Sequence, residues 1–195
     1  MAIKDHGPIY TWDFDNGSSR SEKADYLLST YLLPYLKVAK SCGQLETEDC
    51  KYVFYSLSGK NFNMLNQPTN DFARYYLTNG MSISALVGNA NVDTVWCFLY
   101  VDINGWKKPN KMGVDIFAFN LGQTAGKKTP YRFIFSGYTS MEEDIKTGAY
   151  ACSVENDTPQ SGYFCTHLLR ANGWKVPSKE EYIDMGGTAK GYPWY

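Results

Sequence analysis

The stretch that most constrains the fold runs from Val95 to Leu121, because it places two strand-like segments on either side of a long polar loop. Val95–Val101 is a nearly unbroken run of strand-favouring apolar residues, and Ile116–Leu121 alternates in the manner of a strand with one buried face. The loop between them is rich in Asp, Asn, Gly and Pro and is too long for a two-residue hairpin turn. We therefore expect two sheet strands joined by a loop that something must hold rigid.

Two interpretations of this loop stay open. Side chains such as those of Asp102 and Asn104 can hydrogen-bond to backbone amides, or the loop can hold a cation. Asp102-Ile103-Asn104-Gly105 is similar to the start of an oxygen-ligand calcium loop that Asp115 could complete, although the spacing and the terminal Glu of a helix-loop-helix site are absent. The candidate calcium ligands are therefore Asp102, Asn104 and Asp115, and no other cofactor is expected.

The five cysteines indicate two disulfides and one free thiol. Cys42 and Cys50 flank one polar loop, Cys152 and Cys165 flank another, and Cys97 lies inside an apolar strand. Chain entropy gives each disulfide about 2.5–3 kcal/mol of stabilisation. Such bonds persist in an oxidising compartment, which indicates the periplasm or the cell exterior. Five reduced cysteines in the cytosol are the alternative, and a thiol titration separates the two.

The remaining pattern predicts a single α+β domain over residues 1–195, with helices packed on an antiparallel meander. Ser19 and Glu22 have the spacing of a capping box. Apolar positions then recur at three- and four-residue steps as far as Ala39, with a kink or break at Pro34 and a stop at Gly43. The other expected elements are strands at 52–57, 73–77, 82–87 and 131–135, turns at 79–80 and 89–93, and a short helix at 162–172.

Composition and motifs argue against an enzyme. The 19 basic and 20 acidic residues balance, so no general attraction to nucleic acid or to an anionic membrane is encoded. No apolar run approaches the length of a membrane span. His6 and His167 stand outside any known catalytic motif, and Cys97 is too embedded in apolar sequence to be an activated nucleophile.

Aromatic residues provide the candidate binding groups. Trp106 lies beside Lys107, Lys108 and Lys111, a combination that can hold a nucleic-acid backbone and stack a base. Solvated charge on a turn is the alternative reading of these lysines. Trp194, in the aromatic C-terminal tail, can contact a sugar or a neighbouring subunit, or it can be buried against the edge of the domain.

Several motifs, taken in their order, resemble those of the globular heads of type IV pilin-like proteins, a group of bacterial prepilins and pseudopilins. They cover nearly the whole chain: TWDF at 11–14, YLLPYLKVAKSC at 31–42 with Cys50, LTNGMSI at 77–83, VDINGWKKPNKMGVDIFAFNL at 101–121, CTHLLRANGWKVP at 165–177 and the Tyr-Pro-Trp ending. The resemblance implies a structural subunit of a type IV pilus or a type II secretion pseudopilus, whose partners are other pilin or pseudopilin subunits.

The family's cleavable leader and long apolar N-terminal helix are not in this sequence. The resemblance therefore implies that a helix preceding Met1 anchors the native subunit in the inner membrane before assembly into a cell-surface filament. A second hypothesis is a secreted or surface-attached module that binds glycan or DNA through Trp106 or Trp194. A small secreted hydrolase is a third, and it would need paired carboxylates or an engaged His167 in a pocket.

Overall fold

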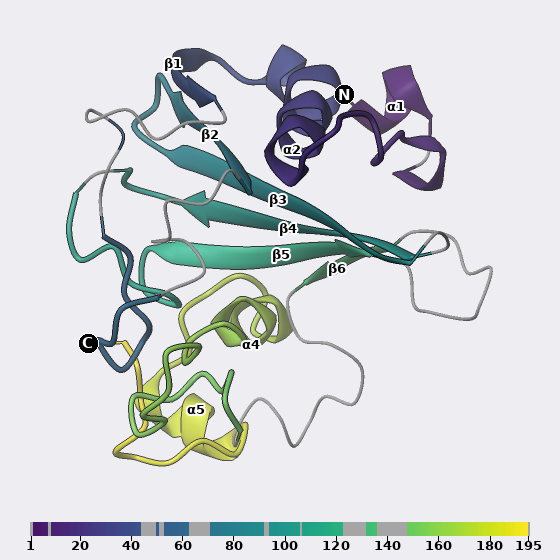
Figure 1. Ribbon diagram of the computed structural model, residues 1–195. Coiled ribbons are helices and arrows are strands. Elements are labelled where there is room, and N and C mark those ends of the chain that lie inside the picture. The colour runs from purple at the N-terminus through teal and green to yellow at the C-terminus, as the bar shows by residue number, and fades with distance from the viewer. Residues whose placement is uncertain are drawn as a thin grey trace. The chain divides into compact units, whose positions relative to one another are not determined.

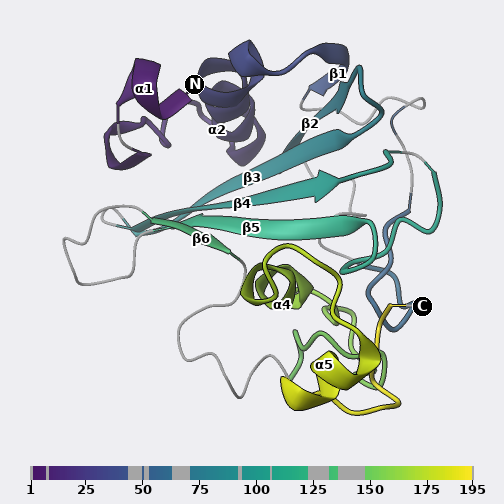
Figure 2. The same ribbon diagram turned by 180° about the vertical axis from the view of Figure 1, so that it is seen from behind.

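A computed structural model gives the fold. It describes residues 2–7, 9–43, 50, 53–62, 71–91, 94–105, 107–122, 132–135 and 148–194. Six strands form one sheet in the order β1-β2-β3-β4-β5-β6, and antiparallel pairing joins β1 to β2, β2 to β3 and β3 to β4. The α+β class is therefore confirmed, and Figures 1 and 2 show the sheet from its two sides. The strands are β1 Val38–Gly43, β2 Phe72–Leu77, β3 Ser82–Asn91, β4 Thr94–Asp102, β5 Ile116–Gly122 and β6 Arg132–Phe135.

The helical elements lie before and after the strands in the sequence. Those before are α1 Ala2–His6, η1 Ile9–Thr11, α2 Arg20–Leu27, the π-helical turn η2 Leu28–Leu32 and the 3-10 turn η3 Leu33–Tyr35; those after are α4 Cys165–Ala171 and α5 Lys179–Asp184. The chain divides into two compact units. Unit 1 is Met1–Lys51, Pro68–Gly105 and Phe119–Ile134, and unit 2 is Tyr52–Gln67, Trp106–Ala118 and Phe135–Tyr195.

In unit 1, α2 packs against β2 and β3. The apolar side of α2 contributes Ala24 and Leu27, and Leu28 follows them at the start of η2; all three side chains are fully buried. Alternate residues of β3, among them Ile83 and Val87, face the same core because successive side chains of a strand point to opposite sides. Each large aliphatic side chain buried here contributes about 1.5–3 kcal/mol of stabilisation.

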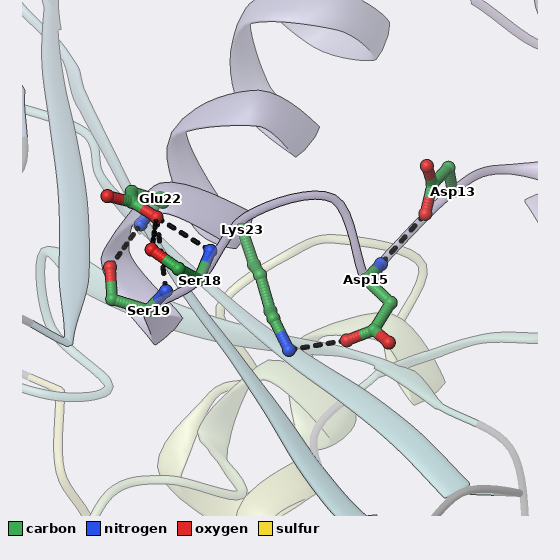
Figure 3. A network of polar contacts seen from close by, with 6 residues as sticks. All are labelled: Asp13, Asp15, Ser18, Ser19, Glu22 and Lys23. Carbon is green, nitrogen blue, oxygen red and sulfur yellow. Dashed lines mark hydrogen bonds and ion pairs between the residues drawn. The ribbon is translucent and has the colours of Figure 1, made fainter.

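Helix α2 begins with the predicted capping box (Figure 3). The Ser19 hydroxyl accepts a hydrogen bond from the Glu22 amide, and the Glu22 carboxylate accepts from the amides of Ser18 and Ser19. The Ser18 hydroxyl and these amides hold the pKa of the Glu22 carboxyl below its usual value. Asp15 pairs with Lys23 of the first helical turn, and Asp13 accepts from the Asp15 amide at 2.9 Å, so the preceding loop is tied to the helix.

The sequence prediction of this helix was wrong beyond Leu36. Pro34 lies in η3, directly after the α-helical and π-helical turns, as a proline that breaks a helix should. Ala39 and Gly43, which were expected in the helix and at its end, belong to β1 instead. A run of apolar residues at mixed spacing fits either element, and pairing with β2 decides the outcome.

The remaining strand predictions were mostly confirmed. The hairpin at Asn79-Gly80 is present, but its loop holds three residues, since the Leu77 amide donates to the Met81 carbonyl at 2.9 Å and Gly80 has φ +87°. Asn89–Asn91, expected as a turn, extends β3. The strand expected at 52–57 was wrong: Tyr55 forms isolated bridges, and its neighbours turn at Gly59.

Unit 2 contains α4, α5 and the irregular segments between and around them. Tyr182 of α5 is buried, and its hydroxyl donates to the Cys152 carbonyl at 2.6 Å. Tyr192 and Trp194 pack their rings at steep angles to one another and to Tyr182. Helix α5 was not among the predicted elements, although Ser178 and Glu181 form a second capping box and have the spacing that identifies one.

Candidate functional site

The turn after β4 is braced by Asp102. This carboxylate is 2% exposed, and its Oδ1 atom accepts hydrogen bonds from the amides of Asn104 at 3.0 Å and Gly105 at 2.8 Å. Gly105 has φ +67°, and a β-carbon there would lie 2.6 Å from the Gly80 carbonyl oxygen. The turn therefore has the side-chain bracing that was one of the two sequence interpretations, and Asp102 provides it.

A second carboxylate organises the turn before β5, within unit 2. Asp115 is 3% exposed and accepts hydrogen bonds from the amides of Asn110 at 2.8 Å and Lys111 at 2.5 Å. Asn110 has φ +52°, a left-handed conformation that asparagine tolerates better than most residues. Two backbone hydrogen bonds join this turn to Tyr55: the Tyr55 amide donates to the Asn110 carbonyl, and the Met112 amide donates to the Tyr55 carbonyl, each at 2.8 Å.

Both buried carboxylates thus accept hydrogen bonds from backbone amides. Nowhere among the described residues do three or more His, Cys, Asp or Glu side chains gather as a metal-binding group. Calcium binding by Asp102, Asn104 and Asp115 stays a prediction. The hydrogen bonds from backbone amides to the two carboxylates can hold the loop without an ion.

The disulfides join the predicted cysteines, Cys42 to Cys50 and Cys152 to Cys165, and Cys97 is a buried free thiol. Cross-links of this kind persist in an oxidising extracellular or periplasmic environment. Among the residues that the structure describes, no helix has both the length and the apolar character needed to cross a membrane.

Cys165, which is disulfide-bonded to Cys152, packs directly against the turn that Asp115 organises. A β-carbon at Gly113 would lie 2.4 Å from the Cys165 sulfur, so no larger residue fits without displacing the cross-link. On the first turn of α4, the Thr166 hydroxyl accepts a hydrogen bond from the Ala118 amide at 3.1 Å. The disulfide, α4 and the start of β5 therefore form one closely packed region of unit 2.

Trp194 is a packing residue. It is 7% exposed, and its Nε1 atom donates to the Gly113 carbonyl at 2.7 Å. Of the two interpretations of the tail, burial is the one observed, and the indole has no open face for a sugar or a base. Trp106 lies outside the described residues. Lys107 and Lys108 are exposed beside it, and Lys111 is half-buried.

The groups considered for catalysis are in unfavourable settings. His167 on α4 is half-buried, and burial together with the neighbouring Arg170 charge lowers its pKa. Burial raises the pKa of the Cys97 thiol, so a thiolate at this position is strongly disfavoured. The Cys97 thiol therefore lacks the activation that nucleophilic chemistry requires.

One exposed aromatic residue was missed as a candidate. Trp174 follows α4, is 55% exposed, and has φ +65°, which is unusual for a bulky side chain. Its amide donates to the Leu169 carbonyl at 2.7 Å, and the Asn172 side chain bonds the Lys175 carbonyl, so the turn is pinned on both sides. The Asn172-Gly173 pair was the sequence signal that a turn would present this ring.

Comparison with known proteins adds a family. No curated protein and no solved structure matches the chain. A family model described as "Family of unknown function (DUF6613)" matches residues 1–182, nearly the whole sequence, and the chain therefore belongs to this family.

Proposed function

We propose that this chain is the globular head of a pilin-like subunit from a bacterial type IV pilus or type II secretion pseudopilus. Its work is packing against neighbouring subunits and presentation of its loops, without catalysis. The observation that carries the proposal is α2 packed on β2 and β3 of an antiparallel sheet, in a chain whose motifs follow the pilin-like order. Fold alone does not determine function, so the motif order supplies the rest of the support.

Two further features favour a structural role. Both disulfides close short loops, of 8 and 13 residues in sequence separation, which suits a domain that must stay folded outside the cell. The buried carboxylates Asp102 and Asp115 are used to fix turns. Rigid turns favour repeated packing of identical subunits, because little conformational entropy is lost when they meet a neighbour.

The proposal includes a location and a route of assembly. The subunit is held in the inner membrane by an apolar helix upstream of Met1 and is then incorporated into a surface filament or a periplasmic pseudopilus. Its partners are other pilin or pseudopilin subunits. These features depend on the sequence resemblance and on the oxidising environment that the disulfides require.

The test has two parts. The genomic reading frame upstream of Met1 should encode a cleavable leader followed by an apolar helix. Filaments sheared from the native cells should contain this chain by mass spectrometry, and cells lacking the prepilin peptidase should retain it in the membrane fraction. A native gene that starts at Met1, together with absence of the chain from both fractions, would refute the proposal.

A second candidate function is a surface binding module for glycan or DNA. The observation that favours it is the exposed indole of Trp174 on a pinned turn, next to Val176, which is also 55% exposed. Glycan-array and DNA-shift assays of the chain, repeated with Trp174→Ala and Trp106→Ala, test it. Binding that survives both substitutions would exclude these rings as the site, and binding lost with Trp174→Ala alone would place the site after α4.

A further inference from the structure

The sequence contains four asparagine-glycine pairs, a dipeptide in which the asparagine side chain is chemically labile. Glycine has no side chain to hinder its backbone nitrogen, so that nitrogen can attack the preceding side-chain amide. The reaction also requires the nitrogen to give up its proton. The pairs are Asn16-Gly17, Asn79-Gly80, Asn104-Gly105 and Asn172-Gly173.

Three of the pairs have the glycine N–H engaged in a turn. The acceptors are the Leu77 carbonyl for Gly80 at 3.0 Å, Asp102 Oδ1 for Gly105 at 2.8 Å and the Arg170 carbonyl for Gly173 at 3.0 Å. Hydrogen bonding to the N–H holds its proton and fixes the peptide in the turn geometry. Each of these nitrogens is therefore a poorer nucleophile than an unbonded one.

The fourth pair is different. Asn16 and Gly17 are exposed and lie between Asp15 and Ser18 of the network in Figure 3. Within the described part of the chain, neither the Gly17 N–H nor the Asn16 side chain has a hydrogen-bond partner. The residues on each side of this pair are held by α2. Asp15 forms an ion pair with Lys23, and the Ser18 amide donates a hydrogen bond to the Glu22 carboxylate. The labile pair is thus the unbonded segment of a loop that is otherwise fixed.

We propose that Asn16-Gly17 is the site of spontaneous modification in this protein, by deamidation. The Gly17 nitrogen loses its proton and attacks Cγ of Asn16, and the side-chain nitrogen leaves as ammonia. Water then opens the resulting succinimide. Breaking the bond from nitrogen to Cγ gives aspartate, and breaking the bond from nitrogen to the main-chain carbonyl carbon gives isoaspartate. No oxidant or enzyme takes part, and the inference does not depend on the proposed function.

The two products should differ in effect, because the backbone at Gly17 lies tightly against the start of α2. A β-carbon on Gly17 would be 2.8 Å from both the Lys23 amide nitrogen and Glu22 Cβ. Isoaspartate adds one methylene to the backbone at residue 16, directly before this close contact, and so displaces Gly17 from its position against the helix. The amides of Ser18 and Ser19 must then move relative to the Glu22 carboxylate. Aspartate keeps the backbone path and adds a negative charge near the helix N-terminus, where the helix dipole favours it.

The experiment compares the four pairs in one sample. The folded, disulfide-bonded chain is incubated in mildly alkaline buffer, digested with trypsin and mapped by mass spectrometry, where deamidation adds about 1 Da. Residues 5–20 form one tryptic peptide in which Asn16 is the only asparagine. We expect Asn16 to react roughly tenfold faster than the asparagines of the other three pairs, since their glycine amides must first lose a hydrogen bond. A rate at Asn79, Asn104 or Asn172 equal to or above that of Asn16 would overturn the proposal.

A matched control separates the fold from the local sequence. In concentrated urea the turns are lost, so the four rates should converge. If Asn16 remains the fastest by the same factor in urea, the structural argument is wrong. The Asn16→Asp variant provides the normal-aspartate product directly, and it should keep the far-UV spectrum of the parent chain. Isoaspartate in the peptide 5–20, detected with an isoaspartyl methyltransferase, should form several-fold more slowly in the variant than in the parent, because an aspartate before glycine closes the same succinimide less readily than an asparagine does; equal rates in the two chains would contradict the assigned origin.

Discussion

Replacing Asp115 tests whether a buried carboxylate holds the turn before β5. The carboxylate is 3% exposed and accepts the amides of Asn110 and Lys111. Asp115→Ala removes both acceptors and leaves two backbone N–H groups without their partners. Asp115→Asn keeps one acceptor oxygen and turns an NH2 group toward the other amide. The stability of the folded chain should therefore fall in the order parent, Asp115→Asn, Asp115→Ala.

The magnitude follows from the number of bonds. A hydrogen bond to a charged group contributes about 1.5–3 kcal/mol, so losing two lowers the free energy of unfolding by about 3–6 kcal/mol and losing one by about half of that. Asp157, an exposed carboxylate paired with Lys60, is the matched control. Asp157→Ala should cost about 1 kcal/mol or less, because an exposed ion pair contributes little.

Urea denaturation, followed by circular dichroism and by tryptophan fluorescence with the disulfides intact, measures the effect. With an m-value of about 2 kcal/mol/M, the Asp115→Ala midpoint should fall by about 1.5–3 M. Coincident transitions by the two probes are needed for this conversion, because the chain has two compact units. A midpoint indistinguishable from that of Asp157→Ala would refute the bracing argument. Loss of parent stability in a calcium chelator would then identify a bound ion as the brace.

Three further measurements follow from the structure. Trp194→Phe removes the donor to the Gly113 carbonyl and should lower the free energy of unfolding by about 1–3 kcal/mol in the same urea assay; no change would contradict the packing role of the indole. Burial, and then the hydrogen bond to Asp25, raises the pKa of Tyr75 to about 12, above the value near 10 of an unfolded tyrosine. The protonated Tyr75 side chain therefore contributes its full stabilisation of the fold below pH 10, and this contribution is lost as the pH rises toward 12. Ultraviolet absorbance of tyrosinate in the parent and in Tyr75→Phe should show this late-titrating group, and identical titrations would exclude it. Unfolding without reductant should expose one thiol, that of Cys97, and a count of five would contradict the disulfides.

The sheet was predictable where each strand carries its own signal. Val95–Val101 lies within β4 and Ile116–Leu121 within β5. Strand-favouring residues fill these two segments, and the turn-forming residues are gathered in the loop between them. The cysteine pairing was also predictable, since each pair flanks a short polar loop. Local signals of this kind need no knowledge of the rest of the fold.

Other features depend on contacts between distant residues. Val38–Gly43 reads as the end of a helix and becomes a strand because it pairs with β2. From the sequence alone, Trp194 fits a binding residue and a buried one equally well. Its hydrogen-bond partner, the Gly113 carbonyl, is 81 positions earlier in the sequence. In each case the deciding information is tertiary.

Gly113 is held from two directions, by the Cys165 sulfur on one side and by the indole of Trp194, which binds its carbonyl. The packing around Gly113 is therefore complete only once Trp194, 81 positions later in the sequence, has reached it. Loss of Trp194 should leave unit 2 poorly packed, even though the cross-link between Cys152 and Cys165 stays intact.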